Sequence, residues 1–466
     1  LLKERYRMEQ ITKPHCGARL DRLPDCRWHS SMFAIVSFGL LVCWSNAVGG
    51  LILAQLKELG WTDNSTTATF SAITTAGMFL GALVGGIIGD KTGRRNAFIL
   101  YEAIHIASMV VGAFSPNMDF LIACRFVMGV GLGALLVTLF AGFTEYMPGR
   151  NRGTWSSRVS FIGNWSYPLC SLIAMGLTPL ISAEWNWRVQ LLIPAILSLI
   201  ATALAWRYFP ESPRWLESRG RYQEAEKVMR SIEEGVIRQT GKPLPPVVIA
   251  DDGKAPQAVP YSALLTGVLL KRVILGSCVL IAMNVVQYTL INWLPTIFMT
   301  QGINLKDSIV LNTMSMFGAP FGIFIAMLVM DKIPRKTMGV GLLILIAVLG
   351  YIYSLQTSML LITLIGFFLI TFVYMYVCYA SAVYVPEIWP TEAKLRGSGL
   401  ANAVGRISGI AAPYAVAVLL SSYGVTGVFI LLGAVSIIVA IAIATIGIET
   451  KGVSVESLSI DAVVNK

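Results

Sequence analysis

The sequence predicts an all-α membrane protein in which twelve transmembrane helices form two pseudo-symmetric six-helix bundles. Of the 466 residues, 55% are hydrophobic and only 13% are charged, and the mean hydropathy is +0.67. A soluble domain carries about 25% charged residues, so this composition excludes a cytosolic enzyme, a disordered tail and a disulfide-stapled secreted module. Apolar runs of the length that crosses the hydrocarbon core, about 20 residues, recur along the chain.

Twelve such runs follow one another in the order in which helices would cross the membrane. They occupy residues 31–53, 67–89, 97–114, 118–142, 157–181, 189–208, 273–293, 308–330, 338–355, 358–383, 399–420 and 425–446. The polar stretch after the sixth run separates two sets of six. The predicted order is an N-terminal tail (1–30), a six-helix bundle (31–210), a linker with short helices (211–271), a second six-helix bundle (272–447) and a C-terminal tail (448–466).

The polar linker has two parts. In the first part, apolar residues recur at helical spacing among mixed charges, which predicts an amphipathic helix. Its apolar face consists of Leu216, Ala225, Val228, Met229, Ile232 and Val236. The second part, from Pro243 to Pro260, is rich in Pro and Asp and predicts a tether. The whole linker is too small for the soluble signalling domain that a sensor would carry.

Lys and Arg residues predict the orientation in the membrane. The chain has 36 of them and a net charge of +10. If the N-terminal tail is cytoplasmic, only Lys57, Arg188 and Lys306 fall in outer loops, which is the asymmetry that the positive-inside rule requires. Both termini are therefore predicted to be cytoplasmic. Because the positive charge serves this topology, we expect no nucleic-acid partner.

The sequence offers no pattern for a disulfide framework, a metal site or a catalytic site. Its seven Cys residues are an odd number without a C-x-x-C pair, which predicts free thiols. His15, His29 and His105 are too far apart in sequence for a metal cluster. An enzyme would need a nucleophile and a base, or metal ligands, within the apolar runs, and we find none. We predict no metal, no cofactor and no enzymatic activity.

Three groups of charged residues recur at equivalent places in the two halves. They follow the second and eighth, the fourth and tenth, and the sixth and twelfth runs. The first copies are Asp90, Arg94, Arg95, Glu145, Arg152 and Glu211, and the second copies are Asp331, Arg335, Glu387, Arg396 and Glu449. The offset between copies is about 240 residues, which indicates a duplicated helical bundle.

The segments Gly-Asp-Lys-Thr-Gly-Arg-Arg (89–95), Pro-Glu-Ser-Pro-Arg-Trp-Leu (210–216) and Glu-Thr-Lys-Gly (449–452) carry a known pattern. With them, the chain resembles the major facilitator superfamily, in its sugar-porter and organic-ion branch. The resemblance implies a monomeric carrier of the bacterial inner membrane with a substrate site between its halves. It also implies that the repeated charged residues form a cytoplasmic gate, closed while the carrier faces outward. The alternative is that these cations only set the topology.

Arg125 lies in the fourth run, where a cation costs about 2.5–3.5 kcal/mol on insertion scales. The glycines that follow it predict a close contact with another helix. The resemblance implies an acidic partner in the first run, but the corresponding residue here is Ser45, beside Asn46. Protons therefore couple elsewhere, or do not drive the carrier, or the substrate supplies the counter-charge to Arg125. A purely structural role for Arg125, bonded to backbone and Asn46, is the alternative.

Arg406 lies in the eleventh run, one turn after Asn402, and is predicted to face the bundle interior. Two arginines with almost no acidic residue in the membrane predict an anionic substrate. Snorkelling of Arg406 to the headgroups is the alternative. Amide and aromatic side chains predicted to orient the substrate, or else to join two helices, are Asn164, Trp165, Asn284, Gln287, Tyr288, Asn292, Tyr374 and Tyr379.

Glu102 and His105, three residues apart in the third run, are the candidates to replace the missing acidic residue as a proton site. Glu145 is the other candidate. The sequence thus predicts a secondary active transporter that moves a small polar metabolite, a sugar acid or other carbohydrate-derived carboxylate, by alternating access with proton symport. Its partners are the substrate, lipid and protons. The alternatives are a neutral-sugar facilitator or symporter, a drug or metabolite exporter, and a transport-derived sensor.

Overall fold

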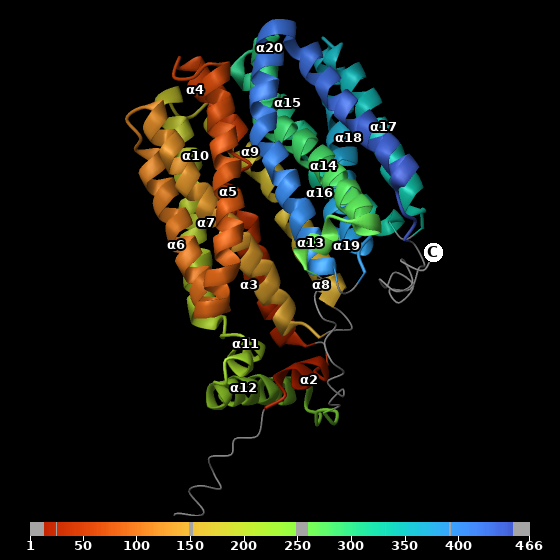
Figure 1. Ribbon diagram of the computed structural model, residues 1–466. Helices are drawn as coiled ribbons and strands as arrows, with labels where there is room; N and C mark the ends of the chain where they lie inside the picture. The colour runs from red at the N-terminus through yellow and green to blue at the C-terminus, as the bar shows by residue number, and fades with distance from the viewer. Residues whose placement is uncertain are drawn as a thin grey trace, which may run out of the picture.

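The computed structural model describes residues 14–24, 26–148, 152–247, 260–330, 332–390 and 393–450, and every regular element in them is a helix. Two helical bundles stand side by side, the first coloured red to yellow and the second green to blue (Figure 1). The first bundle contains α3 (Arg27–Val42), α4 (Gly49–Glu58), α5 (Asn64–Thr92), α6 (Arg94–Ala113), α7 (Met118–Tyr146), α8 (Arg152–Gly163), α9 (Ser166–Leu177) and α10 (Ala183–Tyr208). The second contains α14 (Gly267–Thr300), α15 (Leu305–Met316), α16 (Gly318–Val329), α17 (Arg335–Ser354), α18 (Met359–Cys378), η2 (Tyr379–Tyr384), α19 (Val385–Glu387) and α20 (Lys394–Ile446).

These elements make twelve membrane spans. In the described part of the chain, nine helical segments are long and apolar enough to cross a membrane. One of them, α20, holds two spans joined at Gly424, whose φ of 65° and ψ of −160° turn the chain back. The broken pairs α3/α4 and α8/α9 supply the other two. The prediction of twelve spans in a helical membrane protein is confirmed.

The first span is broken where the sequence predicts a continuous helix. α3 ends at Val42 and α4 begins at Gly49, and the residues between them form a turn. Ser45 and Asn46 lie in this turn, which suits side chains that compete for backbone hydrogen bonds. The break leaves the Ser45 carbonyl outside a helical ladder, so that it is free to accept a hydrogen bond from another helix.

Glycines bring α5 and α7 into backbone contact. A Cβ atom on Gly129 would lie 2.4 Å from the Thr74 carbonyl oxygen, and one on Gly77 would lie 2.3 Å from the Phe126 carbonyl oxygen. Only residues without a side chain fit there. The close helix contact predicted from the glycines after Arg125 is confirmed, and it carries Arg125 up against α5.

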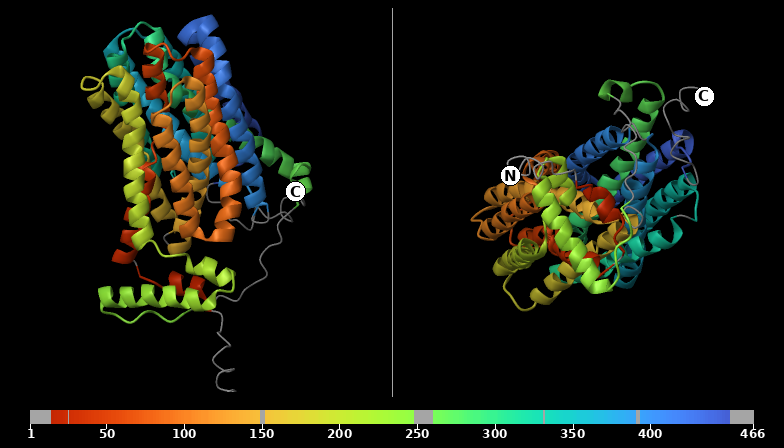
Figure 2. Two further views of the ribbon diagram at one scale, coloured as in Figure 1. Left: turned by 90° about the vertical axis from the view of Figure 1, so that its left-hand side faces the viewer. Right: turned by 90° about the horizontal axis from the view of Figure 1, so that it is seen from below.

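Short helices cover one end of the first bundle, which we call the linker end. α12 (Tyr222–Thr240) lies across this end, next to α2 (Cys16–Asp21) and α11 (Pro213–Ser218) (Figure 2). The predicted apolar residues Ala225, Met229, Ile232 and Val236 of α12 are buried, and they pack with α2 and α11. The next helices are α13 (Tyr261–Leu264) and α14, which begins at Gly267, before the predicted end of the linker.

An ion-pair network fixes α2 to α12. The Arg19 guanidinium donates to both Glu226 and Glu233, with Nη2 2.7 Å from Glu233 Oε2, and Arg22 Nη2 lies 2.6 Å from Glu233 Oε1. Partial burial acts to raise the pKa of the Glu233 carboxyl, but hydrogen bonds from Arg19 and Arg22 outweigh it and lower that pKa below its usual value. The N-terminal segment is thereby held to the linker electrostatically.

The two bundles meet toward the opposite end, which we call the far end. A Cβ on Gly50 would lie 2.5 Å from the Ile291 carbonyl oxygen, so α4 and α14 touch through their backbones. Asn64 Nδ2 donates to Ser421 Oγ at 2.9 Å, and Asn312 Nδ2 donates to Ser171 Oγ at 3.0 Å. These contacts hold the bundles together at the far end.

Candidate functional site

The first copy of the repeated motif is built around Gly93. Its φ of 96° lies in a region open to glycine, and a Cβ there would fall 2.2 Å from Glu211 Oε2. Glu211 Oε1 accepts hydrogen bonds from the backbone N–H groups of Arg94 (2.7 Å) and Arg95 (3.3 Å). A carboxylate from the end of the sixth span thus caps the N-terminus of α6, where both the free N–H groups and the helix dipole favour an anion.

The Arg94 side chain ties three segments of the first bundle together. Its Nη1 lies 2.7 Å from Asp90 Oδ1 and its Nη2 lies 2.8 Å from Glu145 Oε1. Glu145 also accepts a hydrogen bond from the Ser212 hydroxyl. Arg95 instead donates to the Trp206 carbonyl oxygen. The motif residues therefore brace the linker end of the first bundle.

The second bundle repeats this arrangement. Glu449 accepts from the N–H groups of Arg335 (2.8 Å) and Lys336 (3.2 Å), as Glu211 does from Arg94 and Arg95. Arg335 Nε lies 3.0 Å from Glu387 Oε2, and the Thr450 hydroxyl donates to Glu387. The repeat read from the sequence is therefore present in three dimensions.

The predicted gate residues are brought together within each bundle. The Arg396 guanidinium lies 5.2 Å above the Tyr261 ring. Asp331 lies outside the described residues, as does the side chain of Arg152. Among the residues that the structure describes, the ion pairs of the motifs join segments of one bundle to each other. Their role as a gate between bundles stays a prediction for a conformation with the linker end closed.

Arg125 is buried in the first bundle, with 1% of its surface exposed. Its Nη1 donates to the Ser45 carbonyl oxygen at 2.7 Å, and its Nε lies 3.2 Å from Thr74 Oγ1. Its guanidinium carbon lies 4.6 Å from the centroid of the Phe70 ring. Asn292 of the second bundle approaches the same place, because a Cβ on Gly49 would lie 2.9 Å from Arg125 Nη2 and 3.4 Å from Asn292 Oδ1. All these partners are uncharged.

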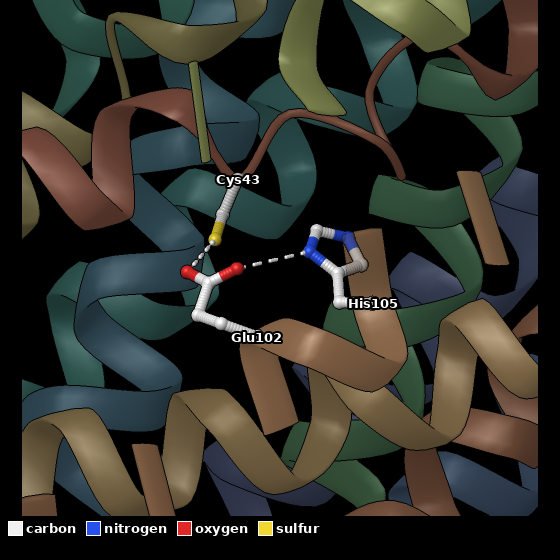
Figure 3. Close-up of side chains that lie close together, drawn as sticks. All are labelled: Cys43, Glu102 and His105. Carbon is white, nitrogen blue, oxygen red and sulfur yellow. Dashed lines mark hydrogen bonds and ion pairs between the residues drawn. The ribbon is translucent and has the colours of Figure 1, made fainter. Parts of the chain in front are cut away.

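Beside Arg125 lies a cluster that the sequence separates by more than fifty residues. The Cys43 Sγ lies 3.8 Å from Glu102 Oε1, and Glu102 Oε2 lies 3.5 Å from His105 Nδ1 (Figure 3). On the other side of the imidazole ring, Nε2 lies 2.7 Å from Ser45 Oγ. Glu102, His105 and Ser45 have no exposed surface. The turn between α3 and α4 therefore connects Arg125 to an ionisable pair on α6.

The cluster also bears on the prediction that the chain lacks a metal site. The donor atoms of Cys43, Glu102 and His105 lie within 4.8 Å of one another. The argument from the spacing of the three His residues missed this, because folding joins one His to a Cys and a Glu instead. The Cys43 thiol donates toward Glu102 Oε1 at 3.8 Å, and Glu102 Oε2 lies 3.5 Å from His105 Nδ1, so we interpret the cluster as a set of proton donors and acceptors. The absence of a metal stays a prediction.

The polar candidates of α14 lie near the first bundle. Asn284 and Asn292 are buried, and Tyr288 packs its ring against Gly409 of α20. Asn284 Nδ2 donates to the Leu280 carbonyl oxygen one turn earlier. Gln287 lies near the hydroxyl groups of Tyr167 and Tyr374, and the buried Tyr374 hydroxyl has no hydrogen-bond partner. This face of α14 is therefore a polar seam between the bundles.

Tyr374 of α18 meets Tyr167 of α9, with ring centroids 5.3 Å apart. The sequence argument missed Tyr167, although it lies three residues after Asn164 and therefore on the same helical side. Trp165 packs edge-on against Phe317 at 6.3 Å and is 37% exposed. Asn164 donates to the Ser160 carbonyl oxygen. The contacts of Tyr374 with Tyr167 and of Trp165 with Phe317 therefore join the two bundles.

Four candidates lie outside this group. Tyr379 stacks on Tyr384, with centroids 5.0 Å apart, toward the linker end of the second bundle. Asn402 is exposed and donates to the Ser398 carbonyl oxygen. Arg406 is partly exposed, with a buried Nη1 that has no hydrogen-bond partner. Asn46 is partly buried in the turn after α3.

Comparison with known proteins identifies the family. The model of the Major Facilitator Superfamily matches residues 33–413, which is most of the chain. The chain belongs to the major facilitator superfamily. The twelve spans in two related bundles are the architecture expected of this family.

Relatives and solved structures agree with this assignment. The chain is 99% identical, over 98% of its length and 100% of the relative, to "Putative metabolite transport protein YdjK" of Escherichia coli (strain K12). It is 44% identical, over 97% of its length and 99% of the relative, to "Inner membrane metabolite transport protein YdjE" of the same strain. A partially occluded inward-open structure of the xylose transporter XylE from E. coli superposes with a TM-score of 0.73 at 18% identity, covering 92% of this chain and 100% of that one. The chain is therefore a multi-pass inner-membrane metabolite transporter.

Proposed function

We propose that this transporter imports a small organic anion, a sugar acid or related carboxylate, together with protons. The observation that carries the proposal is Arg125. Its guanidinium is buried at the seam between the bundles, and its direct partners among the described residues are uncharged. Glu102 is separated from it by His105 and Ser45, so the guanidinium remains available to the carboxylate of a ligand. A carboxylate fits a guanidinium through two parallel hydrogen bonds.

The other polar groups of the seam support a hydroxylated substrate. Asn292 approaches Arg125 from the second bundle, while Gln287, Tyr167 and Tyr374 offer neutral donors and acceptors from both bundles. Such groups recognise hydroxyls by hydrogen bonding. These groups come from both bundles. Rocking one bundle against the other therefore exposes the seam first to one side of the membrane and then to the other. We place both termini in the cytoplasm, on the charge asymmetry of the loops.

A neutral sugar is the second candidate. The neutral amide and tyrosine groups of α14, α9 and α18 favour it, and it needs no counter-charge for Arg125. In that case the contacts of Arg125 with the Ser45 carbonyl and Thr74 serve structure alone. The two candidates differ in their dependence on Arg125.

Ligand-induced thermal stabilisation of the purified full chain separates them. A ligand at 100 times its Kd stabilises the folded state by about 2.7 kcal/mol. We expect D-gluconate to stabilise the wild type and D-glucose not to. Arg125→Ala removes a charged hydrogen-bonding partner, worth about 1.5–3 kcal/mol, and weakens gluconate binding about 10- to 100-fold. Arg207→Ala, at an exposed arginine, is the matched control. Stabilisation by neutral sugars alone, insensitive to Arg125→Ala, would falsify the anion proposal.

A further inference from the structure

The buried charges of the first bundle connect into a single chain of contacts. Arg125 Nη1 donates to the Ser45 carbonyl oxygen, Ser45 Oγ touches His105 Nε2, and His105 Nδ1 faces Glu102 Oε2. Glu102 Oε2 and His105 Nδ1 are both buried and have no hydrogen-bond partner. A carboxylate oxygen and an imidazole lone pair that face each other at 3.5 Å lack only a proton between them.

We propose that Glu102 and His105 share the transported proton, and that Ser45 links this proton to the anion held by Arg125. This inference rests on the proposed function, which supplies the anion. The proton enters from water on one side, bonds to the Glu102 carboxylate or His105 Nδ1, and leaves unchanged to water on the other side. No other bond forms or breaks.

Charge balance within the buried site couples the two ligands. Arg125 contributes one positive charge and ionised Glu102 one negative charge, so the empty site is neutral. A proton alone leaves the site with a charge of +1, and a monovalent anion alone leaves it with −1. The proton and the anion together restore neutrality. Because net charge in a low-dielectric site is costly, the empty and doubly loaded forms are the stable ones, which is the requirement for symport.

The surroundings add no further charge to this balance. Among the described groups, Cys43 faces Glu102 and its thiol donates toward Oε1 at 3.8 Å. The helices α5, α7 and α10 pack against α6. Apart from Arg125, the charged residues of α5, α7 and α10 lie near the helix ends and are Asp90, Lys91, Asp119, Glu145, Glu184, Arg188 and Arg207. The uncharged ionisable groups of these helices are Cys124, Tyr146 and Tyr208. Arg406 belongs to the other bundle and is partly exposed.

Ser45 is a positioning residue in this scheme. It occupies the break between α3 and α4, where its carbonyl holds Arg125 and its hydroxyl holds the imidazole. An anion that binds Arg125 competes with the Ser45 carbonyl for the same N–H group. A change at Arg125 therefore reaches His105 through one residue. By thermodynamic linkage, the bound anion and the bound proton change each other's affinity by the same factor.

The experiment measures D-gluconate affinity and proton uptake on the full chain at several pH values. For the wild type we expect binding to tighten about tenfold per unit fall in pH across the titration range, with about one proton taken up per anion. Glu102→Gln imitates the protonated carboxyl, so we expect affinity that no longer varies with pH and no proton uptake. Retained binding shows that this variant is folded. Glu184→Gln, at an exposed carboxyl of α10, should behave as the wild type.

A second arm needs no substrate. The infrared difference spectrum of the protein between acidic and alkaline buffer should contain a carboxylate signal that Glu102→Gln abolishes and Glu184→Gln retains. If Glu102→Gln abolishes this signal but the wild type binds no anion, the proposed function is overturned and the proton site is supported. If gluconate binding by Glu102→Gln depends on pH as in the wild type and the infrared signal is unchanged, the inference is overturned while the proposed anion transport is unaffected. Ser45→Ala should weaken the pH dependence, since it removes the hydroxyl next to His105 Nε2.

Discussion

Replacing Gly93 by Ala is the sharpest test of how the motif between α5 and α6 works. The residue has a φ of 96° and a ψ of 164°, a region that costs a residue with a side chain about 1–3 kcal/mol. In addition, the new Cβ would lie 2.2 Å from Glu211 Oε2 and displace this carboxylate from the N–H groups of Arg94 and Arg95. Hydrogen bonds to a charged group are worth about 1.5–3 kcal/mol. We therefore expect the free energy of unfolding to fall by about 2.5–6 kcal/mol.

Two glycines of the same chain serve as controls for this measurement. Gly220 also has a positive φ, of 71°, but nothing lies within 4 Å of its Cβ position. Gly341 lies in α17 with open space and no positive φ, so Ala there should stabilise the helix slightly. Unfolding of the three variants in one detergent, followed by circular dichroism, ranks them. The reasoning fails if Gly93→Ala is no more destabilising than Gly220→Ala, or if Glu211→Ala does not absorb most of the difference in a double-mutant cycle.

Three further predictions concern the proton site, the linker end and the far end. The double variant Ser45→Asp, Glu102→Gln moves the acid to the Nε2 side of His105, on the residue whose carbonyl holds Arg125. We expect it to regain the pH-dependent gluconate binding that Glu102→Gln lacks, and binding that does not vary with pH would contradict the charge balance. The folded-state pKa of Glu233 is lowered, so its contribution to stability is complete above the unfolded pKa and is lost as pH falls through the folded one. Proteolysis of the N-terminal segment should therefore accelerate in acid in the wild type, and Glu233→Gln should be cleaved rapidly at every pH; equal protection of both chains in neutral buffer would refute this. The double variant Asn64→Cys, Ser421→Cys replaces a direct contact between the bundles, so oxidation should stop gluconate exchange and reductant should restore it. Continued exchange after cross-linking would show that the far end need not open.

The sequence was sufficient for the helices and their duplication, because both depend on local and repetitive patterns. Apolar runs of membrane length specify the spans, and the paired motifs specify the repeat, down to Glu211 and Glu449 capping equivalent helices. The same patterns could not reveal the break at Ser45. An apolar run has the same hydropathy whether its helix is continuous or interrupted. The interruption is associated with the contacts of the Ser45 carbonyl with Arg125 and of the Ser45 hydroxyl with His105, which lie far away in the sequence.

Side-chain constellations were predictable only where they are close in sequence. Glu102 and His105 are neighbours on one helix, so the sequence predicts them as a pair. For Cys43 the sequence predicts only a free thiol, since its relation to Glu102 depends on how the segment after α3 packs on α6. Tyr379 shows the opposite failure: residue type suggested a ligand contact, but its position five residues beyond Tyr374 lies in a π-helical stretch that points the ring at Tyr384 instead.

The two bundles are equivalent at their linker ends but differ at the seam, which duplication alone does not require. Their linker ends are equivalent, with Arg94 and Arg335 each bound to a glutamate of the same bundle. They differ at the seam, since the first bundle holds the buried charges of Arg125 and Glu102 and the second contributes neutral amides such as Asn292. The buried Arg272 of the second bundle lies near the start of α14. In the proposed scheme, the cation and the proton site lie within one bundle, so their geometry is preserved while the other bundle moves. The neutral groups then make and break contacts with the substrate at the lower cost of ordinary hydrogen bonds. In this scheme the charges of the first bundle couple the proton to the anion, and motion of the second bundle changes the side of the membrane from which the seam is reached.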